Sequence, residues 1–200
     1  MKKVVHAIFV LVLFVACKDN PVSEKIKETR QNVSNTQEAF KEINEMQEDI
    51  QKLRELTPLT NEEFKDWLPD EIKGMKRIKY KAGQGSYMNL ASVEATYASE
   101  DKSQQFKIQI IDGAGEMGAN ATAAMRIMFS QDFEEETEYK TRRTIKRKGV
   151  KAVEEYHKNN NRSVIQFMQD ERFYFNVTGM NMDVDATWDA IKDLDPGKLG

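Results

Sequence analysis

The class of the fold follows from residues 137–178, which read TEYKTRRTIKRKGVKAVEEYHKNNNRSVIQFMQDERFYFNVT. Apolar residues alternate with polar ones along most of this stretch, as in strands that bury one face. Short polar or glycine-containing segments interrupt the alternation, and such segments join antiparallel strands. The sequence therefore predicts four consecutive strands, over residues 137–147, 150–157, 162–169 and 172–178.

The rest of the C-terminal part predicts a second hairpin and three helices. Residues 86–98 and 106–112 alternate in the same way around a polar turn at residues 100–103. The first helix is predicted to start at a capping box formed by Thr60 and Glu63 and to end at Trp67. The second is predicted over 118–130, with Ala123, Ile127 and Met128 toward the core. The third is predicted over 183–193, with Val184, Trp188 and Ile191 inward. We therefore expect residues 58–200 to form an α+β domain, with an antiparallel sheet of about six strands and helices on one side.

A long amphipathic helix is predicted before this domain, over residues 23–57. Its apolar residues follow heptad spacing, at Ile26, Val33, Phe40, Ile43 and Ile50. Thr29, Thr36 and Gln47 fill other core positions, so the seam is weaker than in a strong coiled coil. Two interpretations stay open: a stalk that forms a homo-oligomer, or a helix that packs on its own domain or spaces it from a membrane.

The first sixteen residues have the pattern of a secretory signal peptide. Lys2 and Lys3 precede the apolar run Val4–Ala16, which only His6 interrupts. Thirteen helical residues span roughly 20 Å, which is short of the roughly 30 Å hydrocarbon core of a bilayer. We therefore expect residues 1–16 to be removed on export, rather than to stay as a transmembrane helix.

The end of this segment, Phe14-Val15-Ala16-Cys17, resembles a bacterial lipobox with Phe in place of the usual Leu. The resemblance implies that signal peptidase II cuts before Cys17, which is acylated and anchors the chain through the tether 17–22. Lys18-Asp19-Asn20 is similar to the export signal of Bacteroidetes surface lipoproteins, which implies an outer-membrane location, facing the periplasm or the cell surface. The alternative is a plain signal peptide followed by an incidental Cys.

Composition excludes several classes of function. The 200 residues are 40% hydrophobic and hold 30 basic and 33 acidic side chains, which gives a net charge of −3. Removal of the signal peptide with Lys2 and Lys3 would leave 28 basic and 33 acidic side chains, a net charge of −5. This balance gives no electrostatic basis for binding nucleic acid. A single Cys excludes an internal disulfide framework and a thiolate zinc site.

A glycine motif raises the question of a nucleotide cofactor. Gly113, Gly115 and Gly118 form G-x-G-x-x-G between a predicted strand and a predicted helix, the place of a dinucleotide-binding loop. However, the preceding strand is half polar, whereas a Rossmann strand is buried on both faces. Asp112 would also place an anion next to a bound phosphate. We therefore interpret the motif as a structural turn and expect no cofactor.

Other chemically active residues give weaker signals. Once the signal peptide is removed His157 is the only imidazole, and we expect it to be a surface residue rather than a base or ligand. The acidic run at 132–136 lacks the spacing of a calcium loop, so no metal site is predicted, and we interpret it as a solvated connection. The basic stretch 140–151 offers two interpretations, a contact with acidic lipid or glycan and a solvent face that discourages edge pairing.

One further resemblance covers about two-thirds of the chain. Residues 67–194 resemble a widespread family of uncharacterised bacterial envelope proteins, and the matching residues are Leu68-Pro69, Ile72, Gly74-Met75, Arg77, Ser92–Ala95, Tyr97, 108–112, 173–177 and Leu194. The resemblance implies no activity. Taken together, the sequence predicts a membrane-anchored lipoprotein without catalytic residues, which binds an envelope protein, lipid or glycan. The alternatives are an adaptor that oligomerises through its stalk and a carboxylate-based envelope hydrolase.

Overall fold

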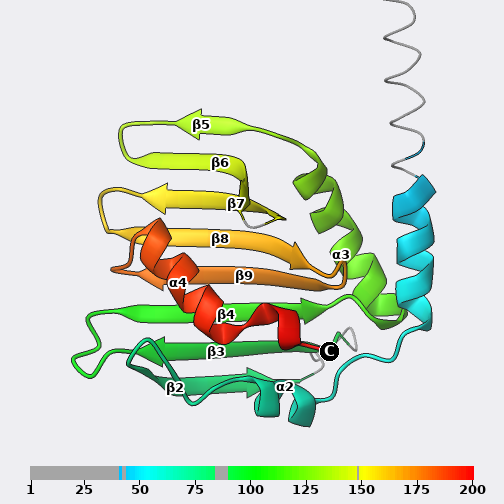
Figure 1. The fold of residues 1–200 in the computed structure, drawn as a ribbon, viewed down its shortest axis with the longest axis horizontal. Helices are drawn as coiled ribbons and strands as arrows, with labels where there is room; N and C mark the ends of the chain where they lie inside the picture. Colours follow the sequence, from blue (N-terminus) through cyan, green and yellow to red (C-terminus); the bar gives the residue numbers. More distant parts are fainter. Residues whose placement is uncertain (1–40, 42–43, 84–89, 148) are drawn as a thin grey trace, which may run out of the picture. The chain divides into compact units, whose positions relative to one another are not determined.

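The computed structural model describes residues 41, 44–83, 90–147 and 149–200. Residues 46–200 form one compact unit. In these described residues nine antiparallel strands make a single sheet in the order β1-β2-β3-β4-β9-β8-β7-β6-β5 (Figure 1). The strands are β1 (Glu71–Ile72), β2 (Met75–Ala82), β3 (Ser92–Ala98), β4 (Gln105–Asp112), β5 (Glu134–Glu136), β6 (Lys140–Arg147), β7 (Val150–His157), β8 (Arg162–Gln169) and β9 (Phe173–Met180).

The α+β class and the antiparallel sheet are confirmed, but the expected strand count of about six is too low. The three additional strands, β1, β2 and β5, lie at the two edges of the sheet. In β2 the register shifts between Arg77 and Lys79, and Ile78 is exposed, so its apolar residues do not alternate regularly. The acidic run at 132–136 was expected to be a solvated connection, but its residues 134–136 form strand β5. The register of β5 places Glu134 and Glu135 opposite two arginines of β6. Opposite charges on neighbouring strands stabilise such a pairing.

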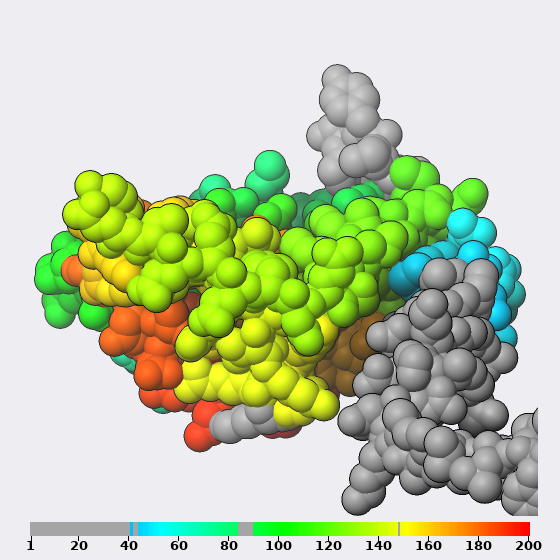
Figure 2. Space-filling view, turned by 90° about the horizontal axis from the view of Figure 1, so that it is seen from above, coloured from blue at the N-terminus to red at the C-terminus, as the bar shows by residue number. Residues whose placement is uncertain are grey.

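The expectation that all helices lie on one side of the sheet is wrong. Helices α2 (Asn61–Trp67) and α4 (Val184–Leu194) contribute to the main core together with Phe173 and Phe175 of β9. Helix α3 (Gly115–Ser130) instead packs through Phe129 on Tyr174, which points to the other face because side chains alternate along a strand. Figure 2 shows α3 in green and α4 in orange and red on opposite sides of the strands.

The predictions for α2 and α4 agree with the structure, whereas α3 begins at Gly115, three residues before the predicted start, and its buried stripe also differs from the prediction. Thr60 caps α2 in the expected box with Glu63. In α4, Ile191 is buried and Val184 and Trp188 pack on the core, as predicted. In α3 the stripe consists of Gly118, Ala119, Thr122, Arg126 and Phe129, while Ile127 is exposed and Ala123 and Met128 are half-buried. The prediction failed because a charged residue, Arg126, takes the core-facing position that hydropathy assigned to its neighbour Ile127.

Only the C-terminal end of the predicted stalk lies within the described residues. Residues 44–55 are helical, and within the compact unit Leu53 is buried and Arg54 Nη2 donates to Asn120 Oδ1 of α3 at 3.0 Å. The seam residues from 26 to 43 lie outside the described residues. Among the described helices, none combines the length and the apolar character that a membrane crossing requires.

Tyr97 makes stability sensitive to alkaline pH. Its side chain is buried in the core, its hydroxyl donates to the carbonyl of Pro69 at 2.9 Å, and burial raises its pKa to about 12. The unfolded chain releases the phenol proton near pH 10, before the folded protein does, so stability falls as the pH rises from about 10 to 12. We expect a slope of about 1.4 kcal/mol per pH unit from this group, measured by urea unfolding. Tyr97→Phe should remove that slope, and an unchanged slope would contradict the assignment.

Candidate functional site

The glycine-rich loop between β4 and α3 is built around a buried ion pair. Asp112 is fully buried, and its Oδ1 and Oδ2 accept from Nε and Nη2 of Arg172 at 2.7 and 2.8 Å. The same carboxylate accepts the backbone N–H of Ala114 at 2.9 Å and that of Leu59 at 2.8 Å. Asp112 thereby ties together the chain before α2, the start of α3 and the start of β9.

Close packing accounts for two of the three glycines of the motif, and backbone conformation accounts for the third. A Cβ at Gly113 would lie 2.6 Å from the carbonyl oxygen of Arg172. At Gly118 it would collide with the carbonyl oxygen of Asp112, and Gly115 has a φ of +76° that disfavours other residues. Strand β4 lies antiparallel between β3 and β9, unlike the parallel first strand of a dinucleotide-binding unit. The geometry therefore gives these glycines a packing role.

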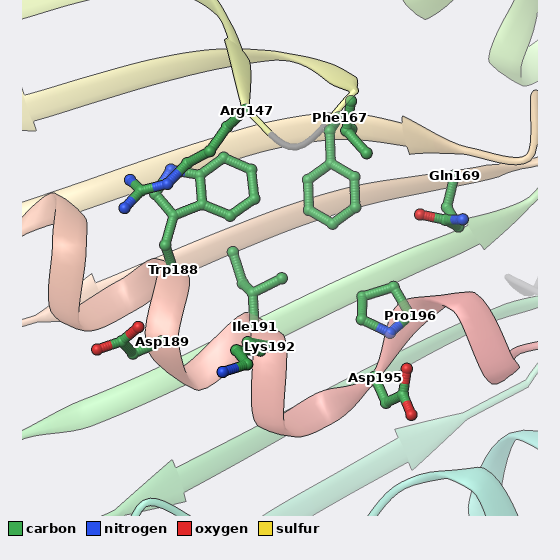
Figure 3. A pocket seen from close by; sticks show the side chains of 10 residues that line it. Arg147, Phe167, Gln169, Trp188, Asp189, Ile191, Lys192, Asp195 and Pro196 are labelled. Carbon is green, nitrogen blue, oxygen red and sulfur yellow. The ribbon is translucent and has the colours of Figure 1, made fainter.

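A separate hollow lies between α4 and the sheet, on the face opposite α3. It has a volume of about 230 Å³, and Phe167, Trp188 and Ile191 contribute to its wall (Figure 3). Phe106, Ile108 and Phe175 do not line it, because they are fully buried in the core. The remaining lining residues are Arg147, Val150, Gln169, Asp189, Lys192, Asp195 and Pro196.

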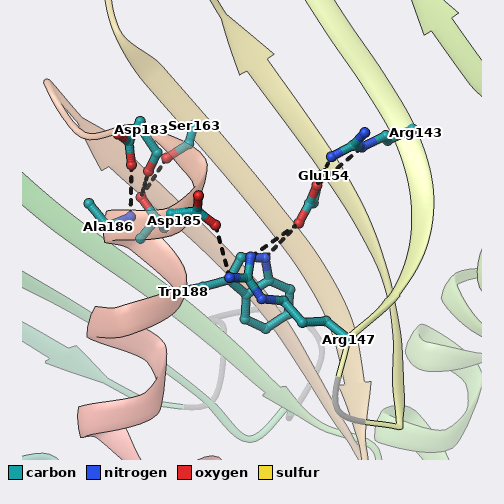
Figure 4. A network of polar contacts seen from close by, with 9 residues as sticks. Arg143, Arg147, Glu154, Ser163, Asp183, Asp185, Ala186 and Trp188 are labelled. Carbon is teal, nitrogen blue, oxygen red and sulfur yellow. Dashed lines mark hydrogen bonds and ion pairs between the residues drawn. The ribbon is translucent and has the colours of Figure 1, made fainter.

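A polar network fixes the tryptophan of this cavity (Figure 4). The indole Nε1 of Trp188 donates to Oε1 of Glu154 at 2.7 Å. Glu154 is buried, and Arg143 donates from Nη2 to its Oε2 at 3.3 Å. The guanidinium of Arg147 lies 5.4 Å from the Trp188 ring centroid and donates from Nη2 to Asp185 at 2.9 Å. The indole is therefore held by a hydrogen bond at its edge and a cation–π contact on its face, which presets the cavity wall.

The basic residues of β6 and β7 are largely neutralised within the chain. Those with a carboxylate oxygen within 4.0 Å are Lys140, Arg142, Arg143, Arg147 and Lys151. His157 lies at the end of β7, half-buried, with Nε2 2.6 Å from Oε1 of Glu155 and 3.4 Å from Nη1 of Arg162. This pairing leaves the stretch with less free positive charge than its sequence indicates.

Two other predictions can be placed only in part. Cys17, the predicted lipid attachment point, lies outside the described residues. Among the residues that the structure describes, no group of three or more His, Cys, Asp or Glu side chains is arranged to hold a metal ion. The two buried carboxylates, Asp112 of β4 and Glu154 of β7, are separated in the sheet by β9 and β8 and each faces arginine.

The cavity under α4 was not predicted, although part of its signal is in the sequence. Only residues 148–149 separate β6 from β7 in the sequence, and the register of the two strands places Arg143 opposite Glu154. That pairing could have been read from the turn. The approach of Trp188 depends on how α4 crosses the sheet, which no local pattern encodes. Comparisons of the whole chain with protein-family models, curated proteins and solved structures found no match.

Proposed function

We propose that this protein is a lipid-anchored component of the bacterial envelope whose α+β domain binds a partner protein through the cavity under α4. The leader and Cys17 support the anchor. The cavity, which places Trp188 and Phe167 beside an opening, carries the binding proposal. Aromatic side chains in preset pockets are typical of the centres of protein interfaces.

Size and charge favour a protein side chain over a whole small molecule. A volume of about 230 Å³ is below the roughly 300–1,000 Å³ of ligand pockets, and it suits one large apolar side chain. Arg147 and Lys192 line the cavity together with Asp189 and Asp195, so both signs of charge are present. A mixed rim complements a peptide segment, whereas an anionic lipid or glycan would favour a cationic one.

Site-specific photocrosslinking in intact cells tests the binding proposal. A photoreactive residue at Lys192, on the cavity rim, should give a crosslink to one protein, and the same residue at Lys102, in the turn before β4, should not. Trp188→Ala should reduce the Lys192 crosslink at least five-fold, because it removes the cavity wall. Equal crosslinking at both positions, or an adduct with lipid only, would contradict the proposal.

The anchor has its own prediction. Cys17→Ser removes the thiol that would carry the acyl chains, so the protein should move from the membrane fraction to the soluble fraction of the envelope. Fractionation followed by immunoblotting measures this change, and Ser23→Ala, which leaves Cys17 in place, is the control. Continued membrane association of Cys17→Ser would rule out lipid anchoring at this residue.

A further inference from the structure

Arg126 is a buried cation whose hydrogen-bonding capacity is mostly unused. Its side chain is 5% exposed, and Nη1 donates to Oε2 of Glu171 at 2.9 Å. Nε and Nη2 are both buried, and neither has a hydrogen-bond acceptor in the part of the chain that the structure describes. Leaving buried charged donors unpaired costs free energy, so a partner for them is expected.

Arg172 shows which kind of acceptor the Nε and Nη2 donors of a guanidinium bind in this protein. Its Nε and Nη2 hold both oxygens of Asp112, at 2.7 and 2.8 Å. The same two atoms of Arg126 are the ones without acceptors. A carboxylate or phosphate group fits this pair of parallel donors bidentately, because the spacing of its oxygens matches the fork.

A cavity of about 540 Å³ lies next to Arg126, on the α3 side of the sheet. Two lysines, Lys146 and Lys151, line it as well. Lys151 is paired with Asp132 at 2.7 Å, whereas Lys146 has no carboxylate within 4.0 Å among the described residues. Glu171, the partner of Arg126 within the described residues, has an exposed side chain, so its pairing is open to competition from solvent and ligand.

We propose that Arg126 binds the oxyanion of a small ligand, a carboxylate or a phosphate, which enters this cavity and accepts from Nε and Nη2 once the guanidinium, whose two free donors are closed to solvent in this structure, turns toward it. Lys146 supplies a second positive charge at the cavity wall. The site is on the α3 side of the sheet and shares only Val150 and Gln169 with the cavity under α4, so it does not depend on a partner protein binding there.

Thermal unfolding of the full chain in detergent tests the site, with inorganic phosphate and acetate as probes and chloride at matched ionic strength as reference. A bound anion stabilises the folded state by mass action, so one probe should raise the midpoint by about 3–6 °C at ten times its Kd. If only phosphate raises the unfolding midpoint, the ligand is phosphorylated. If only acetate raises it, the ligand is a carboxylate. Arg126→Lys, which keeps the charge but loses the fork, should abolish the shift, and Arg54→Lys, on the surface, should retain it.

Two further measurements apply whether or not Arg126→Lys folds. In the wild-type protein the probe should move the NMR signal of Arg126 Nε–H and leave that of Arg172, which is already bonded, in place. In chloride, Arg126→Met should unfold at the same or a higher temperature than wild type, because it removes a buried charge whose partner among the described residues is one exposed carboxylate, that of Glu171. Three results would each overturn the proposal: no effect of either probe, a shift that persists in Arg126→Lys, or a lower unfolding midpoint for Arg126→Met. A lower midpoint for Arg126→Met would mean that a carboxylate of the chain, such as the nearby Asp49, already pairs with Arg126.

Discussion

Replacing Arg172 with methionine should lower the free energy of unfolding by about 3–5 kcal/mol, because it leaves the carboxylate of Asp112 buried without its counter-charge. Asp112 is fully buried, and Arg172 supplies two of its four short hydrogen bonds. Nη2 of Arg172 also donates to the carbonyl of Thr57 at 3.2 Å, and the guanidinium lies 4.6 Å from the ring centroid of Phe173. One substitution therefore loosens three segments at once.

Urea unfolding followed by circular dichroism measures this loss, and Arg54→Met is the matched control. Arg54 makes one exposed hydrogen bond, to Asn120, so its removal should change stability by no more than about 0.5 kcal/mol. Asp112→Asn with Arg172→Met removes both charges and should recover part of the loss. Equal effects of Arg172→Met and Arg54→Met would show that the ion pair does not hold the junction.

Gly118→Ala should destabilise the protein by about 2–3 kcal/mol, although alanine is ordinarily the better helix residue. The added methyl would collide with the carbonyl oxygen of Asp112 and lie 2.8 Å from the carbonyl carbon of Gly113. Both obstacles are backbone atoms, so α3 would have to move away from β4. This loss tests the packing role of the glycine motif, since it arises with no cofactor present.

Gly197→Ala is the matched control, because a Cβ there would meet no atom within 4 Å. It should leave the unfolding midpoint in urea within about 0.5 kcal/mol of the wild-type value. If Gly118→Ala were as stable as Gly197→Ala, close packing could not be the reason for a glycine at position 118.

The sequence predicted those elements whose local pattern and burial agree. The strands over 150–157 and 162–169 match the prediction residue for residue, because short polar turns bound both of them, and burial alternates along most of 162–169. The helix after Asp183 was predicted from the spacing of Val184, Trp188 and Ile191, and in the structure Asp183 also caps it by accepting from the backbone N–H of Ala186. Here propensity, capping and burial favour the same structure.

The predictions that failed concern residues whose partners are distant in sequence. The glutamates of β5 pair with a strand whose arginines lie opposite them, and in α3 Arg126 is buried while its neighbour Ile127 is exposed. The cavity under α4 also needs side chains from strands β6, β7 and β8 as well as from α4 and the turn after it, since Arg147, Phe167 and Trp188 meet only in the folded chain. Hydropathy patterns describe neighbours in sequence, and none of these contacts is between neighbours.

The acidic edge strand β5 affects how neighbouring copies of the protein would contact one another on a membrane. It is the last strand of the sheet, and its residues Glu134–Glu136 are all exposed. An edge strand offers unpaired backbone groups to any neighbouring chain, and a row of like charges makes a second identical edge repel it. Copies held at high density in two dimensions, as lipid anchoring would hold them, would meet edge to edge often. Three consecutive carboxylates would then keep adjacent sheets from merging into one aggregate.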